Sequence, residues 1–407
     1  MKAIDGGVCA PQGFQAAGIR CGIKGGSGKR DLALIYSKAP CTSAALYTTN
    51  QVKAASVLVS RQHTAQGQIR GLIANSGNAN ACTGEAGIAA ARRMAELAGA
   101  ALSIPREQMA VASTGVIGVP LPIQAIEAGI EAITKGLRSD AQGHEAALEA
   151  IMTTDTRKKA GALEIEIAGF PIRLGGMVKG SGMIHPNMGT MLCFITTDAS
   201  ISQELLDKAL RRSVQRSFNR VTVDGDTSTN DMILIMANGE GHNPRIESPG
   251  PDYAVFAAAL EALCISLARA VARDGEGATK LITVTVKEAV DEASAVVLAK
   301  SVASSNLVKA ACFGADANWG RVLCALGYAG IDFDPQRVDV AFASAAGYVC
   351  LCKGGRDLPF CEEVAKQILL EDEIEIIITL GQGVAEAVVW GCDLSYEYVK
   401  INGDYRS

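Results

Sequence analysis

A run of hydrophobic residues, TMLCFITTDA at positions 190–199, constrains the fold of this chain more than any other feature. The run follows a loop rich in glycine, serine, proline and asparagine, and its apolar residues are consecutive rather than alternating. A strand of this kind is typical of a sheet that is covered on both faces. We therefore expect a layered α/β structure with this strand inside it.

The rest of the sequence interleaves helical and strand patterns. Apolar residues at helical spacing predict helices over residues 85–102, 122–137, 144–152, 202–220 and 252–275. Strand patterns occur at 106–114, in a hairpin about AGFP between 161 and 180, in two paired strands around the loop 224–231, and in the C-terminal runs VDVAFASA, GYVCLC, IEIIITLG and AEAVVWG. The predicted class is α/β with mixed α+β layers. The sequence pattern changes after ATKLITVTV, which predicts a domain boundary near residue 285.

The composition and the termini argue against several classes of protein. A net charge of -5 argues against a nucleic-acid binder, which needs a basic face. No apolar run looks long enough to span a bilayer, and the N-terminus lacks the apolar segment of a secretory signal, so we expect a cytoplasmic protein with no membrane partner. The 12 cysteines are scattered without zinc or disulfide spacing, which predicts mostly buried thiols and no metal site.

Thr190 stands where the loop meets the predicted strand, directly after Gly189. A threonine hydroxyl is a weak nucleophile and needs a base within hydrogen-bond reach. A chain break before Thr190 would supply one, since the reference pKa of an α-amine is about 7.7–8.0. The Thr190 hydroxyl could make that break by attacking the Gly189 carbonyl, which no side chain hinders. The residues alone leave two alternatives open: Thr190 as an ordinary first residue of a strand, and His185 as the base.

Other stretches also carry candidate functional residues. Thr114 and Gly115 end a predicted strand, so they form either a plain turn or an oxyanion hole, in which a backbone N–H and a hydroxyl meet. Glu276 lies between two glycines just after a predicted helix, where an exposed carboxylate suits a substrate ammonium. The loop 75–87 leads into a helix and could bind an anion there. The acidic loop 224–231 lacks the last ligand of a calcium loop, so we expect no calcium site.

The block KGSGMIHPNMGTMLCFITTDA closely resembles the cleavage-site block of the ornithine acetyltransferase family. This family, also called bifunctional glutamate N-acetyltransferase/amino-acid acetyltransferase, belongs to arginine biosynthesis. Further blocks resemble the family in the same order along almost the whole chain: IANSGNANACTG, VASTGVIG, MTTDT, VDGDTSTND, ARDGEGATK, GADANWGR and YVKINGDYRS. Blocks that agree in order are far more specific than any single motif.

The resemblance implies a self-cleaving acetyltransferase. Cleavage between Gly189 and Thr190 would give an α chain, 1–189, and a β chain from 190, which stay associated, with α2β2 as the expected heterotetramer. Thr190 would take the acetyl group from N2-acetyl-L-ornithine and pass it to L-glutamate, giving L-ornithine and N-acetyl-L-glutamate through an acetyl-Thr190 intermediate. These small molecules are the expected partners. No cofactor is implied, although some members also use acetyl-CoA as an acetyl donor.

The resemblance further implies a fold and a set of site residues. The fold is the N-terminal-nucleophile-like aminopeptidase/ornithine acetyltransferase fold, with a catalytic domain over 1–285 and a smaller C-terminal α/β domain over 286–407 whose tail returns to the active site. Thr114 and Gly115 match the family's oxyanion hole. The matching substrate-binding positions are Thr154 (or its neighbour Thr153), Lys179, Thr190, Glu276, Asn402 and Ser407.

Three positions depart from the family pattern. Gly189 stands where alanine is usual, and the loss of a methyl group should ease attack on its carbonyl. Ser407 replaces a common threonine and keeps the hydroxyl, and His185 stands where we expect a small residue. Two other functions stay open: an N-terminal-nucleophile amidohydrolase or aminopeptidase on the same fold, and a non-catalytic binding protein.

Overall fold

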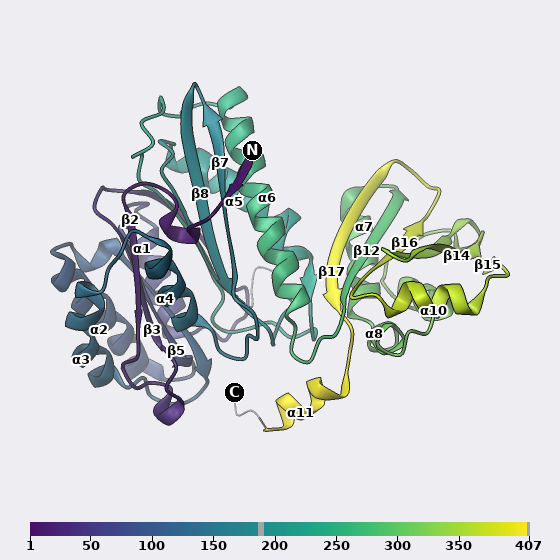
Figure 1. Cartoon of the computed structure of the whole chain (residues 1–407), viewed down its shortest axis with the longest axis horizontal. Helices are drawn as coiled ribbons and strands as arrows, with labels where there is room; N and C mark the ends of the chain where they lie inside the picture. The colour runs from purple at the N-terminus through teal and green to yellow at the C-terminus, as the bar shows by residue number, and fades with distance from the viewer. Residues whose placement is uncertain (186–190, 405–407) are drawn as a thin grey trace.

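The computed structural model describes residues 1–185 and 191–404, and within them it has three β-sheets (Figure 1). The largest part of the molecule is built on a six-stranded sheet of order β1-β7-β8-β9-β11-β4. Its strands are β1 (Lys2–Ile4), β7 (Lys159–Ile167), β8 (Phe170–Lys179), β9 (Leu192–Thr197), β11 (Met232–Ala237) and β4 (Thr42–Tyr47). A four-stranded sheet of order β2-β3-β5-β6 packs on one face of it, with β2 (Phe14–Ile19), β3 (Leu32–Ser37), β5 (Gly71–Asn78) and β6 (Met109–Val116).

Helices cover the outer faces of these two sheets, so the layers run helix, sheet, sheet, helix. The six-stranded sheet is covered by α5 (Gln203–Arg216) and α6 (Pro251–Arg273). The outer face of the four-stranded sheet is covered by α1 (Ala55–Thr64), α2 (Gly84–Leu102) and α3 (Ile123–Lys135), while α4 (Ala141–Ile151) packs against β2 and β3. This arrangement confirms the mixed α/β class and agrees with the N-terminal-nucleophile-like fold.

Strand β9 lies at the centre of these layers. It pairs with β8 on one side and with β11 on the other, and all six of its residues are buried. Leu192 and Phe194 join the core between the two sheets, whereas Cys193 and Ile195 join the core under α5 and α6. The prediction of a strand buried on both faces is therefore confirmed.

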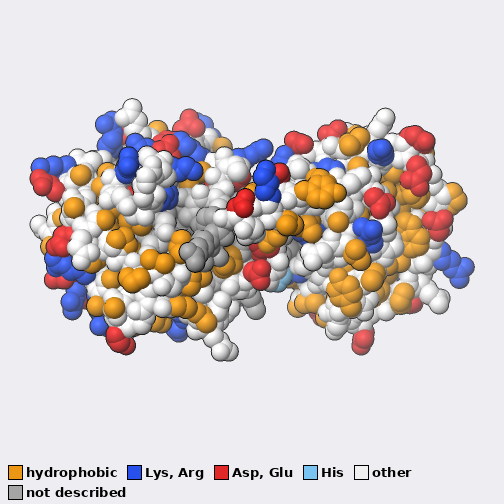
Figure 2. Space-filling view, turned by 90° about the horizontal axis from the view of Figure 1, so that it is seen from below, with side chains coloured by type: hydrophobic (Ala, Val, Ile, Leu, Met, Phe, Trp, Pro, Cys, Tyr) orange, Lys and Arg blue, Asp and Glu red, His pale blue; other side chains and the backbone are white. Residues whose placement is uncertain are grey.

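The second part of the molecule, a separate lobe beside the first (Figure 2), is built on a seven-stranded sheet of order β10-β17-β12-β16-β13-β14-β15. The strands are β10 (Val221–Thr222), β17 (Ala385–Cys392), β12 (Leu281–Ala289), β16 (Glu373–Thr379), β13 (Asp339–Ser344), β14 (Gly347–Lys353) and β15 (Arg356–Asp357). The helices are α7 (Glu292–Ser304), α8 (Asn306–Phe313), α9 (Trp319–Gly327) and α10 (Glu362–Leu370), and then α11 (Tyr396–Asp404) runs back toward the first part (Figure 1). The boundary near residue 285 stays a prediction.

Several boundaries differ from the sequence predictions. The strand predicted at 106–114 begins at Met109, because Arg106–Gln108 forms a 3-10 turn. The helix predicted at 144–152 begins at Ala141, where the Asp140 side chain accepts a hydrogen bond from the Gly143 amide and caps the helix. The helix predicted at 202–220 ends at Arg216.

One strand pairing was wrong. The strands on either side of the loop 224–231 do not pair with each other: β10 pairs with β17, and β11 pairs with β9 and β4. The loop 224–231 does not form a hairpin turn, because its residues form hydrogen bonds with the segment before the predicted cleavage site instead. A two-residue strand such as β10 leaves almost no sequence pattern.

The buried cysteines agree with expectation, whereas helix α6 is a longer apolar run than the sequence led us to expect. All 12 cysteines are unpaired, and most of them are buried. Among the described residues no group of three or more histidine, cysteine or acidic side chains could hold a metal ion. Helix α6 alone, in the described part of the chain, is long and apolar enough to cross a membrane, and here it packs on the six-stranded sheet.

Candidate active site

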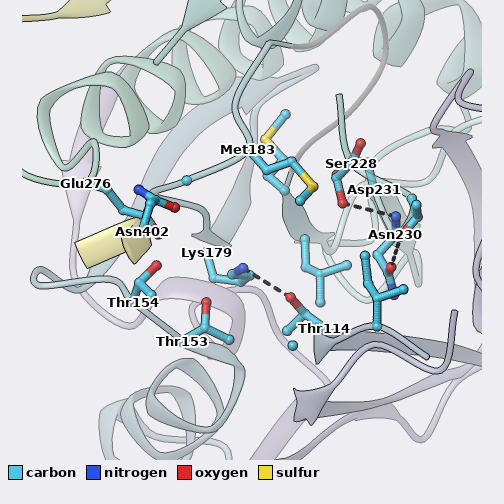
Figure 3. A pocket seen from close by; sticks show the side chains of 16 residues that line it. Thr114, Thr153, Thr154, Lys179, Met183, Ser228, Asn230, Asp231, Glu276 and Asn402 are labelled. Atoms are coloured by element: carbon cyan, nitrogen blue, oxygen red, sulfur yellow. Dashed lines mark hydrogen bonds between the residues drawn. The ribbon is translucent and has the colours of Figure 1, made fainter. Parts of the chain in front are cut away.

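A pocket of about 110 Å³ opens at the ends of strands of the two packed sheets, beside helix α11 near the C-terminus (Figure 3). Its lining comes from the ends of β6 and β8, the turn after α4, the start of β9, the loop before β11, the residue Glu276 after α6, and α11. The residues are Thr114, Gly115, Ile117, Thr153, Thr154, Lys179, Gly182, Met183, Met191, Leu192, Ser228, Thr229, Asn230, Asp231, Glu276 and Asn402.

The structure brings most of the predicted site residues together. All of those that fall in the described ranges line the one pocket: Thr114, Gly115, Thr153, Thr154, Lys179, Glu276 and Asn402. Gly189, Thr190 and Ser407 lie outside the described residues. Met191, which follows Thr190 directly, lines the pocket and is 4% exposed. The roles predicted for these residues stay predictions.

Gly115 is held in a conformation that only glycine adopts easily. Its φ is 134°, and a β-carbon there would lie 2.4 Å from the carbonyl carbon of Gly77 in the neighbouring strand β5. The β5–β6 register also shifts at this point, between Gly77 and Asn78. The backbone at Thr114 and Gly115 therefore leaves the regular ladder and is turned toward the pocket, as an oxyanion hole requires.

Lys179 stands at the end of β8 with its ammonium group in the pocket (Figure 3). Its side chain is buried, and Nζ donates a hydrogen bond to the Thr114 hydroxyl oxygen at 3.1 Å. Burial lowers the pKa of Lys179, and the nearby Asp155 carboxylate opposes that shift. A buried cation beside the predicted oxyanion hole is suited to a substrate carboxylate.

A buried ionic network supports the pocket from behind. Lys159, at the start of β7, bonds to Asp155 at 2.7 Å and also to Asp274 at the end of α6, and the three side chains are 1%, 0% and 2% exposed. Burial opposes ionisation of Asp155, but the charges of Lys159 and Lys179 outweigh it and lower the pKa of Asp155 to about 2. Asp155 also accepts hydrogen bonds from the Thr153 and Gly180 amides. The network therefore holds the backbone at Thr153 and beside Lys179, two residues that line the pocket.

Glu276 and Asn402 close another side of the pocket. Asn402 Nδ2, on α11, donates to Glu276 Oε2 at 2.8 Å, so α11 contacts this side of the pocket. The Glu276 amide donates to the Ser181 carbonyl at 2.9 Å. A β-carbon at Gly182 would lie 2.3 Å from the Glu276 carboxyl carbon, so only glycine lets the backbone approach this side chain so closely. In Figure 3, Thr154 lies below Asn402 and Thr153 lies below Lys179.

Sequence reasoning missed the loop before β11. Ser228, Thr229, Asn230 and Asp231 line the pocket, although the sequence pattern predicted no site role for any of them. Asn230 Nδ2 donates to the carbonyls of Ala79 and Ser113 at 2.6 and 2.7 Å, which ties the loop to the end of β6. The signal that could have found it is the buried polar run TSTND directly before a fully apolar strand.

His185, the alternative base, is not among the residues that line this pocket. Its Nδ1 lies 3.0 Å from the Thr222 hydroxyl in β10, which belongs to the seven-stranded sheet. Burial, with the charge of Lys300, lowers the pKa of His185 to about 4. This placement favours a structural role for His185.

We expect His185 to make stability depend on pH between about 4 and 6.5. The unfolded chain protonates this histidine near its reference pKa of about 6.5 and the folded chain near 4, so the unfolded state binds more protons and the free energy of unfolding falls as pH drops through this range. His185→Gln should flatten that slope, as measured by urea unfolding at several pH values. The exposed His242→Gln is the control, and an equal flattening in both variants would contradict the assignment.

The ArgJ family model matches residues 15–407. The arginine biosynthesis bifunctional protein ArgJ of Symbiobacterium thermophilum is 54% identical over 408 residues, with 100% of both chains covered, and that of Caldanaerobacter subterraneus is 49% identical over 407 residues, again with 100% of both chains covered. A crystal structure of the protein of that name from Bacillus halodurans is 45% identical, with a TM-score of 0.51, and covers 53% of this chain and 100% of its own. The present chain therefore belongs to the ArgJ family.

Proposed function

We propose that this chain cuts itself before Thr190 and then transfers the acetyl group of N2-acetyl-L-ornithine to L-glutamate. As a member of the ArgJ family the chain is an acetyltransferase of arginine biosynthesis. The observation that carries the detailed proposal is the pocket itself: Met191, next to Thr190, faces the same space as Thr114, Gly115, Lys179 and Glu276.

The first step makes the nucleophile. The Thr190 hydroxyl attacks the Gly189 carbonyl carbon, the peptide C–N bond breaks, and an ester joins Gly189 to the Thr190 oxygen. Water then hydrolyses that ester, which leaves a carboxylate on Gly189 and a free hydroxyl and α-amine on Thr190. A break near the middle of the sequence is supported by the solved relative, whose entire chain matches 53% of this one.

The second step is acyl transfer. The Thr190 amine takes the hydroxyl proton, and the oxygen attacks the acetyl carbonyl of acetylornithine. Thr114 and Gly115 stabilise the oxyanion; because Thr114 Oγ1 already accepts from Lys179, its own proton is available to donate. Ornithine leaves with the proton, and the glutamate amine then attacks the acetyl-Thr190 ester and restores the free hydroxyl.

The charged groups of the pocket support the choice of substrates. Acetylornithine and glutamate each carry an α-carboxylate, for which Lys179 is the buried cation in the pocket. Glu276, 8% exposed and bonded to Asn402, offers a carboxylate to the free side-chain ammonium of acetylornithine. Thr154 or Thr153 would contact the substrate from the wall of the same pocket, and Ser407 is proposed to join from the tail.

We expect denaturing mass spectrometry of the purified protein to show two chains, the second beginning at Thr190. Thr190→Ala removes the hydroxyl that both steps need, so this variant should stay a single chain of 42.3 kDa and transfer no acetyl group. Thr197→Ala, which changes a buried threonine in strand β9, is the control for packing. A single uncut wild-type chain after long incubation would contradict the proposal.

Acceptor dependence separates this function from the hydrolase alternative. A transferase releases ornithine much faster when glutamate is present, whereas a hydrolase releases it equally fast with water alone.

We also propose acetyl-CoA as a second acetyl donor, an α2β2 assembly and a cytoplasmic location, following the bifunctional name that the relatives carry and the family pattern.

A further inference from the structure

The segment just before the proposed cleavage site is bound by the carboxylate of Asp224. Asp224, in the loop after β10, accepts a hydrogen bond from the Met183 amide at 2.6 Å through Oδ2 and from the Ile184 amide at 2.9 Å through Oδ1. The mechanism described above gives this side chain no role. It lies outside the pocket lining, whereas Met183, which it holds, is one of the pocket walls.

Met183 needs such a partner because its backbone is strained. Its φ is 59°, a left-handed conformation that residues with a β-carbon rarely adopt. Strained residues of this kind persist where the surroundings determine them, and they gather at functional sites. Charge-assisted hydrogen bonds from two consecutive amides to one carboxylate are strong enough to hold that turn.

Neighbouring contacts complete the attachment. The Val223 amide donates to the Ile184 carbonyl at 2.6 Å, and the Thr227 hydroxyl donates to the His185 carbonyl at 2.9 Å. Ile184 is 1% exposed and belongs to the core under α5 and α6. The residues up to His185 are therefore fixed to the loop 223–227.

The residue on the far side of the proposed cleavage site is fixed as well. Met191 is buried, and its carbonyl accepts a hydrogen bond from the Met232 amide at 3.0 Å. An attack of the Thr190 hydroxyl on the Gly189 carbonyl needs the two atoms about 3–3.5 Å apart and aligned. The chain on both sides of the bond must then be held in place, and Asp224 supplies much of the hold on one side.

We infer that Asp224 is a positioning residue for self-cleavage, which fixes Met183 and Ile184 so that the Gly189–Thr190 bond meets the Thr190 hydroxyl. This inference rests on the proposed function. It has a second consequence, because Met183 precedes the cut and Asp224 follows it. The same two hydrogen bonds afterwards hold the end of the α chain, and the Met183 wall of the pocket, to the β chain.

The test is a time course of self-cleavage in newly synthesised protein, read by denaturing mass spectrometry. Asp224→Ala removes both acceptors, and we expect cleavage at least ten times slower than in the wild type. Asp224→Asn keeps one acceptor oxygen, so we expect an intermediate rate. Asp332→Asn is the control, an exposed aspartate in the loop after α9, and it should cleave at the wild-type rate.

A second readout separates positioning from general damage to the fold. Amide hydrogen exchange at Met183 and Ile184 should accelerate in Asp224→Ala while the amides of β9 stay protected. If Asp224→Ala does not fold, the cleavage rate of Asp224→Asn tests the inference instead. Wild-type cleavage with an equally fast Asp224→Ala would overturn this inference alone, whereas an uncut wild type would overturn the proposed cleavage together with it.

Discussion

Replacing Lys159 with methionine is expected to lower the free energy of unfolding by about 3–5 kcal/mol, the range found when one partner of a buried ion pair is removed. Lys159 is 1% exposed and neutralises both Asp155 and Asp274, whose side chains are 0% and 2% exposed. The variant leaves two carboxylates close together in the interior with no cation between them. Urea unfolding of an uncut form, such as one carrying Thr190→Ala, measures the change as a single-chain transition.

The neighbouring residue supplies the control. Lys158 bonds to Glu145 and Glu149, but its side chain is 45% exposed, and exposed ion pairs contribute roughly 0–1 kcal/mol. Lys158→Met should therefore leave the unfolding midpoint nearly unchanged. Equal losses in the two variants would mean that the buried network is not what stabilises this region.

Gly115→Ala is expected to lower kcat by about 100- to 1,000-fold, the loss seen when one oxyanion-hole donor is removed. The new β-carbon would lie 2.4 Å from the Gly77 carbonyl carbon, and the φ of 134° suits only glycine. The backbone at Thr114 and Gly115 must shift, and with it the proposed donors to the oxyanion. Steady-state acetyl transfer from acetylornithine to glutamate measures the effect, with the extent of self-cleavage recorded alongside.

Gly118→Ala separates the clash from backbone strain. Gly118 also has a positive φ, 78°, but a β-carbon there meets nothing within 4 Å. This variant should lose some stability and keep most of its activity. A loss of kcat in Gly118→Ala as large as in Gly115→Ala would show that strain in this turn, and not the place of the oxyanion donors, accounts for the effect.

The elements that the sequence predicted well are those with a strong local pattern. Helix α2, predicted at 85–102, begins one residue earlier, and the 190–199 run contains β9, because burial on both faces leaves consecutive apolar residues. Pairing partners depend on contacts far along the chain, so the two-residue β10 and its place beside β17 had no local signal. Two starts were missed because a cap or a 3-10 turn decided them: helix α4 begins after its cap Asp140, and strand β6 begins only after the turn at Arg106.

The pocket shows the same division. Thr114 and Glu276 had a local signal, a strand end and a carboxylate between two glycines, whereas Lys179 and Asn402 were selected only by resemblance to a family, since only the fold brings these distant positions together. The Asp155–Lys159–Asp274 network and the Asn230 contacts escaped notice, because buried polar groups matter through partners that no periodic pattern names.

The place of β9 has a consequence for how the protein could recover from unfolding. After a cut before Thr190, β8 would belong to one polypeptide and β9 with β11 to the other, yet these strands stay paired within one sheet. The folded enzyme would behave as one body. After denaturation the two polypeptides would have to meet in solution before the central sheet could form again, so the rate of refolding would depend on protein concentration. The first folding of the chain takes place before the cut, so its rate would not depend on protein concentration.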